Sequence, residues 1–150
     1  MPWRRSARID AAQAGLNAST AGYEIFQAEL LARLRNRYFE VLRREAEHKN
    51  AQEDKTLMDN IRSRIALRVE TGEAARFELI KAEAESLNAQ KNAQAAAFRL
   101  EQSRSLLRQV VGNSLPVKFT VSGNLRTLPT LPPLEQLHQQ LNEKSPELAR

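Results

Sequence analysis

Proline is absent from residues 3–70, and this long stretch limits what the chain can fold into more than any other feature. Only Gly15 and Gly22 weaken the helical pattern there, each by about 1 kcal/mol relative to alanine. A helix of roughly 68 residues is about 100 Å long at about 1.5 Å per residue, which exceeds the size of a small globular domain. The stretch therefore predicts a coiled coil or another extended helical array.

The first helix is expected to end at Thr71-Gly72, because glycine adopts the left-handed conformation that often closes a helix. A second helical pattern, rich in alanine and free of glycine and proline, runs from about residue 75 to 111. We therefore predict an all-α, coiled-coil-like antiparallel hairpin in residues 1–113, with its turn at 71–74. Hydrophobic residues make up 41% of the chain but aromatic residues only 5%, which suits a thin rod better than a thick core.

The two predicted helices can be aligned, since residue i of the first should lie beside a residue near 145 − i of the second. The polar residues 43–56 then face residues 89–102, which are mostly small or polar. The expected apolar contacts near the turn are Leu57, Met58 and Ile61 with Ala84 and Leu87, and Ile65 with Ile80. At the other end, Leu34, Tyr38 and Phe39 are expected to face Leu106, Leu107 and Val111. The second helix is too short to cover residues 3–33, so the tail, another chain or a further segment has to cover their apolar side chains.

Residues 114–150 form a second predicted region with a different character. Residues 117–121 alternate between apolar and polar side chains, which predicts a short strand. A short amphipathic helix is expected from Pro132-Pro133 to about Glu143. The final Ser145-Pro-Glu-Leu is typical of a cap and first turn of another helix, so we expect the chain to be a piece of a longer protein.

The charge distribution, the length of the apolar runs and the cysteine content argue against several classes of function. The net charge is +5, but the basic residues are interleaved with acids and few aromatics are available to stack on bases, so a solvated helix face is favoured over a nucleic-acid surface. No apolar run approaches the about 20 residues of a membrane-spanning helix, so we expect the chain alone to be soluble. The absence of cysteine excludes disulfides and thiolate metal sites.

Catalytic chemistry finds little support in the sequence. His48 and His138 have no companion histidine at a metal-ligand spacing, and both are expected on the surface. Paired acids such as Glu83 and Glu85 lie on a helix face without a pocket. We expect neither an enzyme nor a cofactor. The polar middle of the rod leaves two alternatives open: a single-layer wall around a water-filled space, or a plain coiled coil that serves as a spacer.

Five segments, in this order along the chain, resemble the TolC family of outer-membrane efflux proteins. They are WRRSARIDAAQAGL at 3–16, RNRYFEVL at 35–42, RVETGEAARFELIKAE at 68–83, LLRQVVG at 106–112 and SPELA at 145–149. The resemblance implies that the chain is the first-repeat helical hairpin of such a protein, followed by the start of the equatorial region. The intact protein would then be a trimer in the outer membrane and periplasm of a Gram-negative-type bacterium, with its helices forming an α-helical barrel.

The resemblance also implies partners and a site. The partners of the intact protein would be a periplasmic adaptor (membrane fusion protein) and an inner-membrane transporter, and the segment at 68–83 is most similar to family members paired with heavy-metal-type transporters. The turn would be the periplasmic end of the duct, where Val69, Thr71, Gly72 and Glu73 would contact the adaptor. Glu78 matches an acid near the channel entrance in some members, whereas the family's other entrance residues lie in a second repeat.

Overall fold

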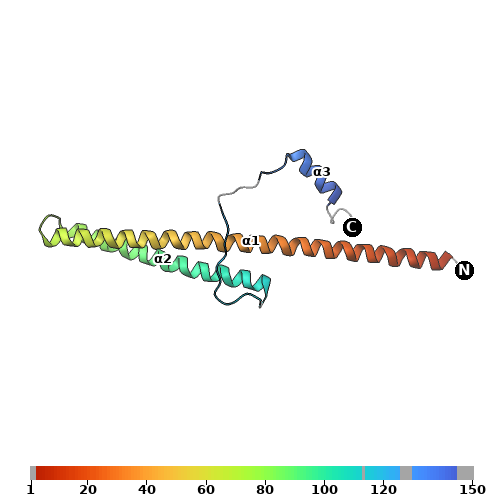
Figure 1. Cartoon of the computed structure of the whole chain (residues 1–150), viewed down its shortest axis with the longest axis horizontal. Coiled ribbons are helices and arrows are strands. Elements are labelled where there is room, and N and C mark those ends of the chain that lie inside the picture. The colour runs from red at the N-terminus through yellow and green to blue at the C-terminus, as the bar shows by residue number, and fades with distance from the viewer. Residues whose placement is uncertain (1–2, 113, 126–129, 145–150) are drawn as a thin grey trace. The chain divides into compact units, whose positions relative to one another are not determined.

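A computed structural model describes residues 3–112, 114–125 and 130–144 of the chain. The described residues form three helices, α1 (Trp3–Glu70), α2 (Arg76–Val111) and α3 (Leu134–Lys144). After a turn at residues 71–75, α2 returns alongside the second half of α1 (Figure 1). The predicted all-α hairpin is confirmed, and the first helix has the predicted bounds because no proline or cap interrupts it.

Two compact units divide the chain, residues 36–125 (the hairpin unit) and residues 1–35 with 126–150. In the second unit, α1 carries exposed large apolar side chains, namely Ile9, Leu16, Tyr23, Phe26, Leu30 and Leu31. The three leucines of α3, Leu134, Leu137 and Leu141, are exposed as well. None of the helices in the described part of the chain has an apolar stretch long enough to cross a bilayer.

The contact between the helices is a seam of small residues on α2. The eight buried residues of this helix recur at alternating intervals of four and three, the spacing of a left-handed coiled coil. They are Ala82, Ser86, Ala89, Ala93, Ala96, Leu100, Ser103 and Leu107. Six of the eight are alanine or serine, so α2 presents almost no side-chain bulk to α1 and the two backbones can approach closely.

Two polar pairs join α1 and α2 along the seam. The Ser86 hydroxyl donates a hydrogen bond of 2.6 Å to the Asp59 carboxylate. Arg104 of α2 donates one of 3.0 Å to the Glu45 carboxylate. Apolar packing is concentrated at the base of the hairpin, where Val41 is fully buried. The base thus combines apolar packing with the Arg104–Glu45 ion pair, whereas the middle of the seam on α2 is formed by Ala89, Ala93 and Ala96.

The alignment predicted for the two helices is confirmed, because Asp59 and Ser86 satisfy the 145 − i relation. The apolar contacts predicted for Ile80 and Leu87 of α2 are wrong, because these side chains are 56% and 66% exposed. Ile80 lies two residues before the seam residue Ala82, and Leu87 lies two residues before Ala89. Two residues along a helix rotate the side-chain direction by about 200°, so both side chains lie on the side of α2 away from the seam. The alanine and serine positions occupy the seam because they permit the closer approach.

The strand predicted at residues 117–121 is also wrong, since the described residues contain no strand. The segment bends at residues 117 and 118, and within the described residues no second strand lies beside it to share a ladder of hydrogen bonds. It crosses α1 instead, where the Tyr38 hydroxyl donates a hydrogen bond to the Ser122 carbonyl. The helix predicted from Pro132-Pro133 is confirmed as α3, and residues 145–150 lie outside the described residues.

Enlarging a seam residue tests the close packing. Ala93 is 1% exposed, so Ala93→Leu forces the helices apart and should lower the free energy of unfolding by about 1–3 kcal/mol, as overpacking does in other cores. Ala84→Leu is the control, because Ala84 lies on the exposed side of the same helix. Equal stability of the two variants in thermal unfolding followed by circular dichroism would contradict a close-packed seam.

The stability of the hairpin should also depend on pH, because its seam contains a carboxylate. The hydrogen bond from Ser86, opposed by burial and assisted by Lys55, lowers the pKa of Asp59 below its ordinary 3.8. The folded state therefore binds this proton less readily than the unfolded state does. The resulting stability is present above the unfolded pKa and is lost as the pH falls through the lowered folded pKa.

Asp59→Asn keeps the shape of the side chain and removes its titration. Its Tm should fall less steeply than that of the wild type between about pH 5 and about pH 2. Asp54→Asn, at an exposed aspartate of the same helix, should keep the wild-type slope. The Asp59 contribution is refuted if the wild type and Asp59→Asn lose Tm in parallel.

Candidate functional site

The turn between α1 and α2, which is the tip of the hairpin, closes its own backbone hydrogen bonds. Gly72 has φ +77°, a left-handed conformation that favours glycine. Its N–H donates to the Val69 carbonyl at 3.1 Å, and the Glu73 N–H donates to the Arg68 carbonyl at 2.8 Å. This pair of bonds is the Schellman motif. The Arg68 guanidinium lies 4.0 Å from the Glu73 carboxylate, where many such motifs have an apolar contact.

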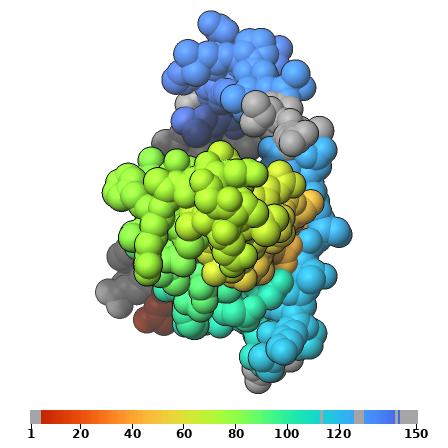
Figure 2. All heavy atoms as spheres, turned by 90° about the vertical axis from the view of Figure 1, so that its left-hand side faces the viewer, coloured from red at the N-terminus to blue at the C-terminus, as the bar shows by residue number. Residues whose placement is uncertain are grey.

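The four predicted tip residues lie together at one end of the hairpin unit. Figure 2 looks directly onto this end, which the turn and the beginning of α2 cover. Thr71, Gly72 and Glu73 are exposed, and Val69 is half-buried. A Cβ atom added at Gly72 would meet nothing within 4 Å. The tip therefore offers a small, accessible surface whose backbone is already satisfied.

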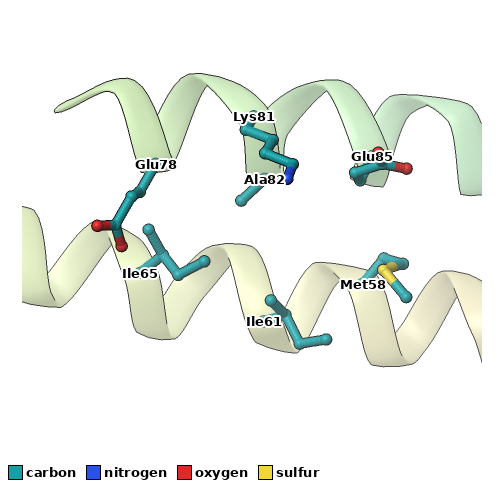
Figure 3. Close-up of a pocket in the computed structure, with 7 residues that line it drawn as sticks. All are labelled: Met58, Ile61, Ile65, Glu78, Lys81, Ala82 and Glu85. Atoms are coloured by element: carbon teal, nitrogen blue, oxygen red, sulfur yellow. The ribbon is translucent and has the colours of Figure 1, made fainter. Parts of the chain in front are cut away.

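An apolar groove of about 310 Å³ runs along one flank of the hairpin just behind the tip. Met58, Ile61 and Ile65 of α1 lie in a row along one side of it (Figure 3). The other side is formed by α2 and is charged, with Glu78, Lys81 and Glu85 around Ala82. We name this feature the flank groove.

Glu78, the predicted entrance acid, borders the flank groove beside Ile65 (Figure 3). It lies in the first turn of α2, where its negative charge complements the positive end of the helix dipole. Its backbone N–H donates to the Ala75 carbonyl at 3.0 Å. Glu78 thus follows the turn closely in the sequence, but it lies on the flank of the hairpin and not in the turn itself.

The face of α2 opposite the seam carries a second apolar stripe, which we name the outer stripe. Its large members are Phe77, Ile80, Leu87 and Phe98. They are among the most exposed apolar residues of the hairpin unit, with Phe98 78% exposed. A helix with apolar residues on two opposite faces is typical of one that packs against neighbours on both sides.

Sequence reasoning located the tip but missed the flank groove and the outer stripe. The missed signal was the regular spacing of alanine and serine, which identifies the seam and so leaves Ile80 and Leu87 outside. His48, expected on the surface, is half-buried in α1, whereas His138 is exposed. Within the described residues, no three His, Cys, Asp or Glu side chains gather in a way that would hold a metal ion.

Comparison with known proteins identifies one relative of this hairpin. The chain is 29% identical over 146 residues, which are 97% of its length, to the cobalt-zinc-cadmium resistance protein CzcC of Cupriavidus metallidurans. It spans 35% of the length of that protein. No protein-family model matches the chain. No solved structure matches it either. The similarity to CzcC includes both long helices and the tip.

The outer stripe predicts that the chain associates with itself. We expect sedimentation to detect oligomers at high concentration, because burying large apolar side chains between copies is favourable by about 25 cal/mol per Å². A double variant, Ile80→Gln with Leu87→Gln, should shift the chain towards monomer. Lys91→Gln is the control on the same side of α2. A clean monomer of the wild-type chain at high concentration would contradict the prediction.

Proposed function

We propose that this chain is the periplasmic hairpin of an outer-membrane efflux protein and forms part of the wall of an export duct. The observation that carries the proposal is the similarity to CzcC along 97% of the chain, through both helices and the tip. The ordered motifs that resemble the TolC family agree with it. A hairpin of 68- and 36-residue helices also has the length and slenderness that a wall element needs.

The distribution of apolar side chains supports a wall of several hairpins. A hairpin that stood alone would leave the outer stripe and the flank groove in water. In a ring of neighbouring hairpins, each copy or repeat can cover the apolar surface of the next, as closed symmetric assemblies do. The trimer is the assembly that the family resemblance implies, and the polar stretch at residues 43–56 of α1 suits a single-layer wall with water on both sides.

The cargo that we propose is a divalent transition-metal cation. The basis is the relative, whose name specifies resistance to cobalt, zinc and cadmium. A duct does not need to bind such an ion tightly, and we propose no catalytic residue or cofactor in this chain. An inner-membrane transporter would supply the energy, and the periplasmic adaptor would join it to the duct.

The adaptor is proposed to contact the tip through Val69, Thr71, Gly72 and Glu73. The exposure of Thr71, Gly72 and Glu73 and the closed backbone of the Schellman motif support this role, since a partner can approach without leaving polar groups of the turn unpaired. Glu78 is proposed to lie near the channel entrance of the assembled protein, on the rim of the flank groove.

A structural coiled-coil module without a transport role is the alternative. It is favoured by the seam, which is complete within one chain and already holds Asp59, Ser86, Glu45 and Arg104 in pairs. The two functions differ in the effect of deleting the parent gene. Loss of tolerance to cobalt, zinc or cadmium supports the duct, whereas unchanged tolerance supports the module.

A pair of glycine variants tests the tip in the full-length parent protein. Gly72 and Gly112 both have positive φ, +77° and +88°, and a Cβ atom added at either position would meet nothing within 4 Å. A valine at either site is strained, by about 1–3 kcal/mol. The strain is at least as large at Gly112, whose ψ of −164° is in a region that is essentially restricted to glycine, so Gly112→Val is a stringent control. Only Gly72 lies at the tip. We expect Gly72→Val to reduce metal tolerance in a complemented deletion strain and Gly112→Val to retain most of it.

The amount of protein in the outer membrane and its helical content should be measured for both variants. Equal losses of tolerance would attribute the effect to backbone strain and would count against a contact role for the tip. Full metal tolerance in Gly72→Val would also count against a contact role for the tip.

A further inference from the structure

The segment at residues 114–125 contacts both helices at the base of the hairpin. It leaves the end of α2 and crosses α1 (Figure 1). On α2, the Arg108 guanidinium donates a hydrogen bond of 3.0 Å to the Leu115 carbonyl. On α1, the Tyr38 hydroxyl donates to the Ser122 carbonyl. The segment thus links two helices that the chain itself joins only at the tip.

Gly123 lies against α1 so closely that a side chain has no room. A Cβ atom there would lie 2.8 Å from both the Leu42 Cδ1 and the Tyr38 hydroxyl oxygen. Both atoms are at the ends of side chains, so an added Cβ would have to displace one of them. Leu42 is buried, and a shift of Tyr38 would disturb its hydrogen bond to Ser122. Glycine is the residue that fits this contact without such a shift.

Between Ala82 and Ala96 the seam gives the hairpin limited support. Alanine and serine dominate it, and each buries little apolar area, so the gain per turn of helix is small. The larger buried residues, Val41 and Leu107 among them, are confined to the end of the hairpin that the segment crosses. At that end α2 stops at Val111 while α1 continues towards its N-terminus. The turn that joins the two helices is at the opposite end of the hairpin, so it does not hold them together here.

We propose that residues 114–125 act as a clamp that holds the end of α2 against α1. The clamp meets α1 through the hydrogen bond from the Tyr38 hydroxyl to Ser122 and through the bare Cα of Gly123, which lies beside Tyr38 and Leu42. Arg108 anchors the clamp on α2. Tyr38 and Gly123 are positioning residues in this device. The proposal does not depend on an efflux role, because every contact lies within the hairpin unit.

Hydrogen exchange of the 150-residue chain tests the clamp. Tyr38→Phe removes one hydroxyl and leaves the ring. We expect the amides of residues 104–111, in the last turns of α2, to exchange about fivefold faster, since one lost hydrogen bond shifts a local opening equilibrium by about that factor. The amides of 119–125 should exchange faster as well. Tyr23→Phe, at an exposed tyrosine of the same helix, is the control and should change neither region.

Gly123→Ala provides an independent variant. It should accelerate exchange in the same two regions, because the added methyl group displaces Leu42 or Tyr38. Gly22→Ala is its control, since a Cβ at Gly22 meets nothing within 4 Å. Faster exchange confined to residues 119–125, or no change in either region, would overturn the clamp, as would equal effects in the variants and their controls. Metal tolerance is not part of this readout, so the result is separate from the proposed function.

Discussion

The close approach of α2 to α1 through a seam of alanine and serine is the constraint on which the rest of the hairpin depends. Because α2 contributes so little bulk, acidic side chains of α1 can lie beside the seam, where Asp59 and Glu45 accept hydrogen bonds from Ser86 and Arg104. Those bonds satisfy the two half-buried carboxylates. A seam of this kind holds two helices in alignment without the thick apolar core of a globular domain.

The same constraint moves the large apolar residues outward. Phe77 and Phe98 of α2 lie opposite the seam, and Met58 and Ile65 of α1 line the flank groove. A soluble spacer has no need for such surfaces, whereas a hairpin with neighbours on several sides does. The similarity to CzcC and the exposed apolar faces therefore support one proposal from independent directions, since the first comes from residue identity and the second from packing.

The two ends of the hairpin are built differently. At the tip, the Schellman motif satisfies the backbone locally and leaves Thr71 to Glu73 exposed for a partner. At the base, Val41 is fully buried, and the segment that crosses α1 at Tyr38 links the two helices. Stability is thus concentrated at the end away from the proposed contact, which leaves the tip accessible at little cost to the fold.

The sequence by itself determined the helix lengths, the turn at Gly72 and the alignment of Asp59 with Ser86, because proline, glycine and spacing act locally along the chain. Only the tertiary structure decided which face of α2 packs on α1. That helix carries two stripes, the small residues of the seam and the large ones around Leu87, and apolar pattern alone favours the large ones. Close approach of the backbones selects the small ones. The strand predicted at residues 117–121 failed for a similar reason, since pairing depends on a neighbour that this segment does not have.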